Sequence, residues 1–256
     1  MTAVPGPPAG ALRTAVLGPL AVTGIAAPLQ PRHAELVVAL ALAGPAGLTG
    51  EALRGVLGAD PDHPRQPASL RQLITRTRCR LGPAPSGGPY IAHRGNSVYA
   101  LDGAAVLDWD KFRDLAGRGR ARRDRGPLRA ALGLLRGQPL AGLYYWWLPA
   151  AALEAMQAAV TSAAVVLAGL ELAAGDPAAA RDAARTGLGA GEGSEDLWRL
   201  LMRAQDAAGN TTGVHAAWRG CQAAAADAEP GAVPHPRTAA LYRDLTSHRR
   251  AAGERG

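Results

Sequence analysis

The pattern of hydrophobic and polar positions divides the chain into a mixed N-terminal part and a helical C-terminal part. Short extended runs, typical of strands, occupy Leu12–Val22 and Ile25–Leu29 and return at Tyr90–Leu101. Apolar positions at helical spacing fill the segment between them. From Ala104 onward only the helical period remains. The pattern therefore predicts a break near residues 102–106, with strands on its N-terminal side and helices alone after it.

Three helices are predicted between the strands. Pro31 opens the first, which runs to about Ala43, and Thr49 caps the second. The third runs from Gln66 to Leu81, where a Gly-Pro pair ends it. The order of strands, three helices and a hairpin is that of a winged helix with an N-terminal sheet. In that fold the third helix reads the DNA groove and the hairpin is the wing.

The third predicted helix has one apolar face and one basic face. Its apolar side consists of Leu70, Leu73, Ile74, Thr77 and Leu81. The other side carries arginines and short polar groups, and no carboxylate occurs between Asp62 and Asp102. Such a face suits a major groove, because Arg pairs with guanine, Gln pairs with adenine, and Ser and Thr bind phosphate. For the helix taken alone, a solvated Arg-rich surface is the alternative interpretation.

The candidate DNA-binding residues lie on this helix and on the hairpin. Gln72 and Arg76 lie opposite Leu70, so we expect them to reach base edges. Residues at the margins of the face are assigned to phosphates, and these are Arg65, Ser69 and Arg80, with Arg94 of the wing. The full set is Arg65, Ser69, Arg71, Gln72, Thr75, Arg76, Arg80, Arg94 and Asn96.

A helical repeat is predicted in the C-terminal part. Gly175-Asp176 and Gly209-Asn210 lie 34 residues apart. Helix–turn–helix units of this length are typical of tetratricopeptide repeats. The register places four side chains inside, namely those of Leu167, Leu170, Leu201 and Trp218.

The predicted fold class is an α+β N-terminal winged helix followed by an all-α helical-repeat, tetratricopeptide-like domain. Residues 1–11 are predicted to be a disordered tail, 12–103 the winged-helix DNA-binding domain and 104–250 the all-helical domain.

Composition adds limits on location and partners. The net charge is +7, and of the 28 basic residues only Lys111 is a lysine. Two distant cysteines, Cys79 and Cys221, define no disulfide framework, which suits a reducing cytoplasm. No signal peptide is expected, and the uncharged apolar runs are shorter than the roughly 18–20 residues of a membrane span. We therefore expect a cytoplasmic protein with no membrane partner.

The sequence contains no recognisable catalytic or metal motif. It has no phosphate-binding P-loop and no G-x-S-x-G, and its histidines show no metal-ligand spacing. His33, His215 and His248 are expected at exposed helix positions. We therefore expect no enzyme, no metal and no cofactor.

An ordered set of motifs resembles the Streptomyces antibiotic regulatory protein family. The set is VLGPLAV at 16–22, RHAEL at 32–36, LTGEALRGVLG at 48–58, ITRTRCRLG at 74–82, the Asp108/Phe112 pair, LRGQPLAG at 135–142, the Gly175-Asp176 turn, and Glu195 with LWRLLMRA at 197–204. The resemblance covers roughly Leu12 to Leu245. The chain departs from the family at Leu57 and Leu135, where tryptophan is expected, and at Thr77, where an apolar residue is usual.

The resemblance implies a response-regulator-type winged helix joined to a bacterial transcriptional activator domain. It implies a cytoplasmic activator of a biosynthetic gene cluster that binds direct repeats in double-stranded DNA near a promoter and contacts RNA polymerase. Self-association on tandem sites would fit such repeats. The alternative is a degenerate relative that keeps the fold but serves as a protein-interaction scaffold without binding DNA. Salt-dependent binding to a duplex separates the two hypotheses.

Overall fold

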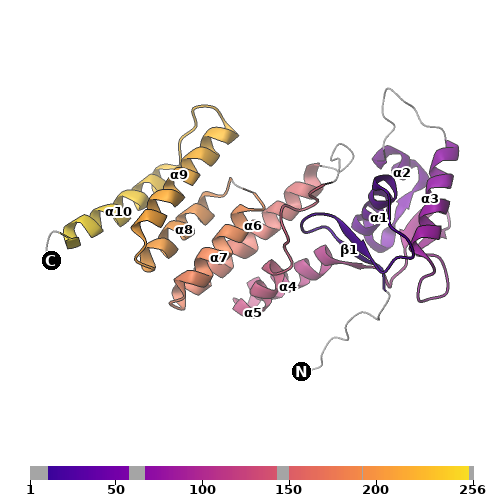
Figure 1. Cartoon of the computed structure of the whole chain (residues 1–256), viewed down its shortest axis with the longest axis horizontal. Helices are drawn as coiled ribbons and strands as arrows, with labels where there is room; N and C mark the ends of the chain where they lie inside the picture. Colours follow the sequence, from indigo (N-terminus) through magenta and orange to yellow (C-terminus); the bar gives the residue numbers. More distant parts are fainter. Residues whose placement is uncertain (1–10, 58–66, 143–149, 192, 254–256) are drawn as a thin grey trace. The chain divides into compact units, whose positions relative to one another are not determined.

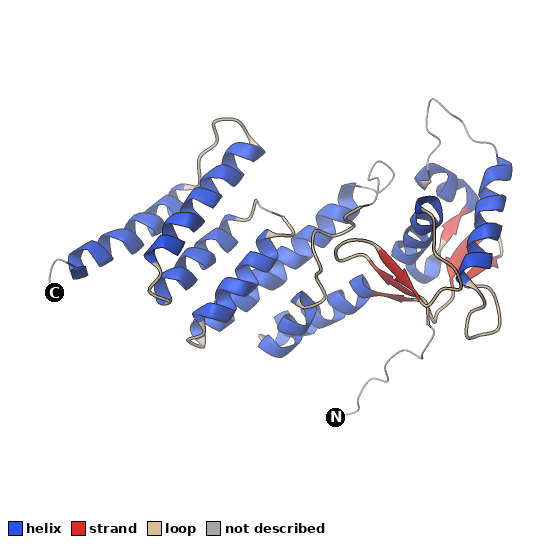
Figure 2. Ribbon diagram, in the orientation of Figure 1, coloured by secondary structure: helices blue, strands red, loops and turns tan. Residues whose placement is uncertain are grey.

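The computed structural model describes residues 11–57, 67–142, 150–191 and 193–253 (Figure 1). The chain forms two compact units. One is Met1–Lys111 with Pro139–Leu153, and the other is Phe112–Gln138 with Glu154–Gly256. The predicted tail lies outside the described residues except for Ala11. Among the described residues, strands end at Leu107 and only helices follow, as the hydrophobic pattern predicted (Figure 2).

The first unit begins with a small three-stranded sheet. β1 (Arg13–Ala15) pairs antiparallel with β2 (Ala21–Thr23) and parallel with β6 (Val106–Leu107), which gives the order β2-β1-β6. The strands are shorter than the predicted extended run Leu12–Val22. Leu12, which precedes β1, is fully buried, and its carbonyl oxygen accepts the N–H of Val106 of β6 at 2.8 Å.

The segment Ile25–Leu29 was predicted to be extended, and this prediction is wrong. It has no strand hydrogen bonds within a sheet. Instead, the N–H of Ala27 donates to the carbonyl oxygen of Arg80 at 3.0 Å. Pro28 has no N–H to add to a ladder, which removes one strand bond at this place.

Three helices follow, and the third is the basic one. They are α1 (Pro31–Ala43), α2 (Gly50–Val56) and α3 (Pro67–Leu81), with a 3₁₀ turn η1 (Gly44–Ala46) after α1. Pro31 is the first residue of α1, where an N–H would have no acceptor within the helix. The missing N–H of proline therefore costs no helical hydrogen bond. The hydroxyl of Thr49 accepts the N–H of Ala52 at 3.1 Å and so caps α2 as predicted. Helix α1 is buried over nine consecutive residues, so it forms the centre of this unit.

A β-hairpin lies beside the helices. β4 (Ile91–Arg94) and β5 (Val98–Leu101) pair antiparallel, and β3 (Leu48–Thr49) joins the other edge of β5. Asn96 and Ser97 form the tip with φ of 59° and 57°. Positive φ at both central residues matches the right-handed twist of the strands. The helices and this sheet are compatible with a winged helix whose wing is β4–β5.

The second unit consists of helical hairpins (Figure 1). Its helices are α4 (Asp108–Arg122), α5 (Arg125–Leu132), α6 (Ala150–Ala173), α7 (Pro177–Leu188), α8 (Glu195–Ala207), α9 (Thr211–Ala228) and α10 (Pro236–Gly253), and the first residues of α4 and α6 belong to the first unit. Consecutive helices α4–α5, α6–α7 and α8–α9 are joined by short turns, and α10 follows them.

Two of these turns have the same geometry at the predicted 34-residue offset. Gly175 and Gly209 adopt φ of 76° and 75°. The next residues, Asp176 and Asn210, each cap the following helix by accepting a backbone N–H three residues on at 2.9 Å. The offset therefore corresponds to repeated helical hairpins.

Four residues were predicted inside the hairpins, and two of them are buried. Leu167 and Leu201 lie in the core. Leu170 and Trp218 are only half-buried, so the prediction for them is corrected. The indole of Trp218 stacks on the ring of Tyr242, with centroids 4.9 Å apart and the planes 9° from parallel. Its burial depends on α10, which begins after a proline-rich loop outside the repeat pattern.

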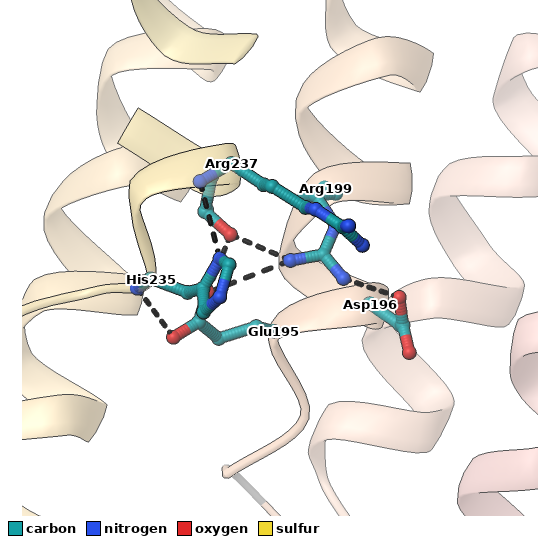
Figure 3. A network of polar contacts seen from close by, with 6 residues as sticks. Glu195, Asp196, Arg199, His235 and Arg237 are labelled. Atoms are coloured by element: carbon teal, nitrogen blue, oxygen red, sulfur yellow. Dashed lines mark hydrogen bonds and ion pairs between the residues drawn. The ribbon is translucent and has the colours of Figure 1, made fainter. Parts of the chain in front are cut away.

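A polar network attaches α10 to α8 (Figure 3). The carboxylate of Glu195 accepts the N–H of His235 at 2.8 Å and the hydroxyl hydrogen of Thr238. The guanidinium of Arg199 donates to the Thr238 hydroxyl at 2.6 Å and to the carboxylate of Asp196. The acidic side chain thus caps the N-terminus of α10 from a neighbouring helix.

Among the described residues, α6 is the one helix that is long and apolar enough to cross a membrane, judged by length and composition. The uncharged apolar runs counted in the sequence are shorter than this helix because they end at charged residues, and one of these, Glu171, lies inside α6. That carboxylate is fully buried and is hydrogen-bonded by Arg129 at 2.7 and 2.8 Å and by Arg125 at 3.1 Å. Met156 and Val160 of the same helix are buried as well.

The two units differ from the division predicted at residues 103 and 104. Strand β6 lies after that point and pairs with β1. The carboxylate of Asp108 accepts the N–H groups of Val16 and Leu17 at 2.8 and 3.1 Å. Farther along, the N–H of Leu140 donates to the carbonyl oxygen of Val16 at 2.7 Å. These long-range bonds attach later segments to the first unit.

Candidate nucleic-acid interface

Helix α3 has one buried and one exposed face. Leu70, Ile74 and Leu81 are buried against the first unit. The exposed side carries four of the predicted site residues, Arg71, Gln72, Thr75 and Arg76, and also Cys79. Because helical residues three and four apart share a face, these four side chains form one continuous surface. No carboxylate occurs in the helix.

Thr77 lies on the buried face of α3, and its hydroxyl is hydrogen-bonded. Its side chain is completely buried, and its Oγ1 donates to the carbonyl oxygen of Leu73 at 2.7 Å. A hydroxyl bonded one turn back avoids most of the cost of burying a polar group. Thr77 can therefore replace an apolar residue while α3 stays packed. The exposed Thr75 makes the same kind of bond to Arg71, at 2.9 Å.

One arginine of α3 has a structural role. The Nε of Arg78 donates to the carbonyl oxygen of Ile91 at 2.9 Å, and the side chain is half-buried. This bond fixes the base of the hairpin to α3. It gives a physical reason for an arginine that was not among the predicted DNA-binding residues.

Two predicted phosphate ligands also have partners within the chain. The Nη1 of Arg80 donates to the carbonyl oxygen of Pro28, and the Nη1 of Arg94 donates to that of Pro45, both at 2.6 Å. Each guanidinium has five N–H donors, so one bond orients the side chain and leaves donors for another acceptor. Asn96 is exposed at the tip of the hairpin.

The side chains of the two remaining predicted residues lie outside the described part of the chain. Arg65 lies outside the described residues. Ser69 belongs to α3, but its side chain is outside them as well. The described part of the site is therefore the exposed face of α3, together with the wing residues Arg94 and Asn96.

A buried histidine lies beside this surface, and its predicted exposure is wrong. His33 of α1 is 5% exposed, and its Nδ1 has no hydrogen-bond partner among the described residues. Burial lowers the pKa of His33, and the positive charges of Arg80 and Arg76 lower it further. The signal was present in the sequence, because His33 is one turn before the apolar positions Leu36 and Val37 on the same face.

The arrangement offers donors rather than reactive groups. In the described part of the chain, no three His, Cys, Asp or Glu side chains gather closely enough to hold a metal ion. Guanidinium and amide groups on an exposed helix can form hydrogen bonds with base edges and phosphates. The chemistry available at this surface is therefore recognition of an anionic, hydrogen-bonding partner.

Comparison with known proteins identifies the fold. No family model and no curated protein sequence matches the chain. Among solved structures, the chain is similar to EmbR of Mycobacterium tuberculosis, determined in complex with a low-affinity phosphopeptide, with a TM-score of 0.65 and 23% sequence identity. The similarity covers 93% of this chain but 65% of EmbR, so the chain spans less than two thirds of that protein's length. At this identity the likeness shows a shared fold.

Proposed function

We propose that this chain is a sequence-specific DNA-binding transcriptional activator of the Streptomyces antibiotic regulatory type. The observation that carries the proposal is the exposed face of α3, which presents Arg71, Gln72, Thr75 and Arg76 without a carboxylate while the opposite face is buried. A helix that packs on one side and offers these groups on the other has the properties of a major-groove reader.

Two kinds of contact are assigned to the site. Gln72 and Arg76 bind base edges, because bidentate amide and guanidinium groups distinguish adenine and guanine. The other site residues bind sugar and phosphate and so fix the register, and these are Arg65, Ser69, Arg71, Thr75, Arg80, Arg94 and Asn96. The bonds of Arg80 and Arg94 to backbone carbonyls support this role by holding each guanidinium in one place before DNA arrives.

Activation is the second part of the proposal. The shared fold with EmbR over 93% of the chain supports an activator built like a regulator of that type. The helical hairpins of the second unit are then the surface for RNA polymerase. Tandem promoter sites would place copies of the chain side by side in a cytoplasmic complex. These partners follow from the family resemblance.

The experiment is a gel-shift selection with the full chain. Fragments of the source genome are mixed with the protein, and retained fragments are sequenced and then titrated across a salt series. A groove reader enriches a common sequence and loses affinity as the salt concentration rises. Retention of no fragment at low salt would contradict the proposal.

The alternative function is a protein-interaction scaffold. It is favoured by the repeated helical hairpins of the second unit, whose turns at Gly175 and Gly209 share one geometry. The helical hairpins of the second unit would then provide the binding surface. A chain that folds, binds no duplex at low salt and captures RNA polymerase subunits would establish this alternative.

A further inference from the structure

The three helical hairpins of the second unit turn in the same way. In each, the residue that caps the second helix donates its N–H to a carbonyl five residues earlier. The bonds are Asp124 N to Gly119 O at 2.9 Å, Asp176 N to Glu171 O at 2.9 Å and Asn210 N to Gln205 O at 2.8 Å. The residue before each cap has positive φ. The turns can therefore be compared position by position.

The first turn departs from the others at the position of positive φ. Gly175 and Gly209 fill it in the second and third turns, whereas Arg123, with φ of 49°, fills it in the first. Glycine adopts this conformation without steric cost, and arginine does not. Arg122 likewise replaces the alanine of the other turns. A residue that weakens its own turn points to a use for its side chain.

The charge around this turn is unbalanced. Six exposed arginines lie between residues 118 and 129, namely Arg118, Arg120, Arg122, Arg123, Arg125 and Arg129. Arg118 pairs with Asp114 at 2.6 Å, and Arg120 donates to the hydroxyl of Ser162 at 3.0 Å. Arg125 and Arg129 share one carboxylate, that of Glu171.

Two arginines at the turn have side chains without a partner. Among the described residues, the side chains of Arg122 and Arg123 form no hydrogen bond or ion pair. With Arg125 they line an open depression, whose single acidic group is Asp124. That carboxylate accepts the N–H of Gly126 at 2.9 Å, so it is used as a helix cap. The depression is basic and accessible.

We propose that this basic tip, Arg122, Arg123 and Arg125, binds the phosphate backbone of duplex DNA. Phosphate contacts need positive charge and no apolar core, whereas protein interfaces are centred on buried apolar and aromatic anchors. The apolar lining here is only Leu170 and two alanines at the end of α6. The inference rests on the proposed DNA binding, and it adds a second set of phosphate contacts outside the winged-helix region.

The test compares two full-chain variants with equal loss of charge. Arg122→Gln with Arg123→Gly removes two tip charges, and Arg203→Gln with Arg219→Gln removes two exposed charges elsewhere in the unit. Binding to a fluorescein-labelled 30-base-pair duplex of random sequence is measured from about 0.05 to 0.3 M salt. The tip variant should bind about thirtyfold more weakly near 0.15 M, with a salt slope lower by about two. The matched control should bind like the parent.

Thermal unfolding separates this result from a folding defect. Because glycine suits the conformation of Arg123, the tip variant should melt at the temperature of the parent or above it. Weaker binding together with unchanged or higher stability supports the inference.

Four results would overturn the inference. If the tip variant binds the duplex like the parent, the tip makes no phosphate contact, and the proposed function of α3 stands. If both variants weaken equally, total charge explains the binding. If the tip variant keeps duplex binding but loses binding to poly-L-glutamate, the tip is a protein-docking site. A parent that binds no duplex at low salt overturns the inference and the proposed function together.

Discussion

At the scale of single residues, local contacts could be predicted and distant ones could not. The helical wheel placed Thr77 on the buried side, and its hydroxyl partner is four residues away in the same helix. The carbonyl partners of Arg80 and Arg94 are 52 and 49 residues away. No pattern within α3 or the wing reveals these partners. The assignment of both arginines to phosphates remains a prediction.

His33 should make the stability of the first unit depend on pH. Its pKa is lowered in the folded chain by burial and by two arginines, so the folded state binds fewer protons than the unfolded state. Stability should therefore be complete above the unfolded pKa of about 6.5 and fall as the pH drops toward the folded pKa, by at most about 1.4 kcal/mol per pH unit.

The measurement for His33 is urea unfolding between pH 7.5 and 5. The other titratable groups that the structure places near α1 are Glu35, paired with Arg32 at 3.0 Å, and the arginines of α3. His33→Gln keeps a neutral polar side chain and serves as the comparison. The parent should lose more stability than this variant as the pH falls. Parallel curves would show that His33 does not contribute.

At the scale of elements, the helices and the hairpin were predictable because their signals are local. Prolines, glycines and the Thr49 cap mark the helix ends, and in the structure these ends lie close to the predicted positions. The prediction of an extended segment at Ile25–Leu29 was wrong because strand pairing needs a partner, and this backbone bonds to α3 instead. The predicted burial of Trp218 was wrong for a similar reason, since its ring partner Tyr242 belongs to a helix outside the repeat.

Removing an arginine from α3 and removing one from the wing should weaken DNA binding in different ways. Arg76→Ala should cost about 1–3 kcal/mol on the cognate site and relax the preference at one base pair, because a bidentate contact is sequence-specific. Arg94→Ala should weaken cognate and scrambled duplexes about equally and lower the salt slope by about one. Anisotropy titrations of both duplexes across a salt series measure this.

Arg203→Ala is the control for the loss of one exposed charge outside the site. Thermal unfolding is needed for Arg94→Ala as well, because this change also removes the bond to Pro45. If Arg76→Ala and Arg203→Ala bind every duplex alike, α3 is not the reading helix.

The buried carboxylate of α6 gives an element-scale prediction for the second unit. Glu171→Gln should cost about 1 kcal/mol, because the amide still accepts a hydrogen bond and the two arginines remain accessible to water. The chain itself has glutamine at the equivalent repeat position, Gln205. Replacing both Arg125 and Arg129 by alanine should destabilise more, since it leaves a buried carboxylate unpaired. Chemical unfolding ranks the variants, and the reverse order would contradict this account.

At the scale of the whole molecule, the break between strands and helices was predictable from a change of period, but the extent of each unit was not. Strand β6 and Leu140 belong to the first unit through bonds to β1 and Val16, which are far away in the sequence. Periodicity reports which element forms and says little about which element it joins. The net charge of +7 likewise gave no location for the basic tip at Arg122 and Arg123.

The salt dependence of binding should report the sum of the proposed phosphate contacts. Four arginines lie in the first unit, at Arg65, Arg71, Arg80 and Arg94, and three lie at the basic tip, at Arg122, Arg123 and Arg125. Each contact releases about 0.9 counterion from B-DNA, so the parent should show a slope of about −6 in log K against log salt. Replacing Arg94, Arg122 and Arg123 together should leave a slope of about −3.6, because well-separated contacts add. A parent slope near −1 would mean that most of these arginines do not touch DNA, and the bonds of Arg80 and Arg94 to carbonyls would then be their main role.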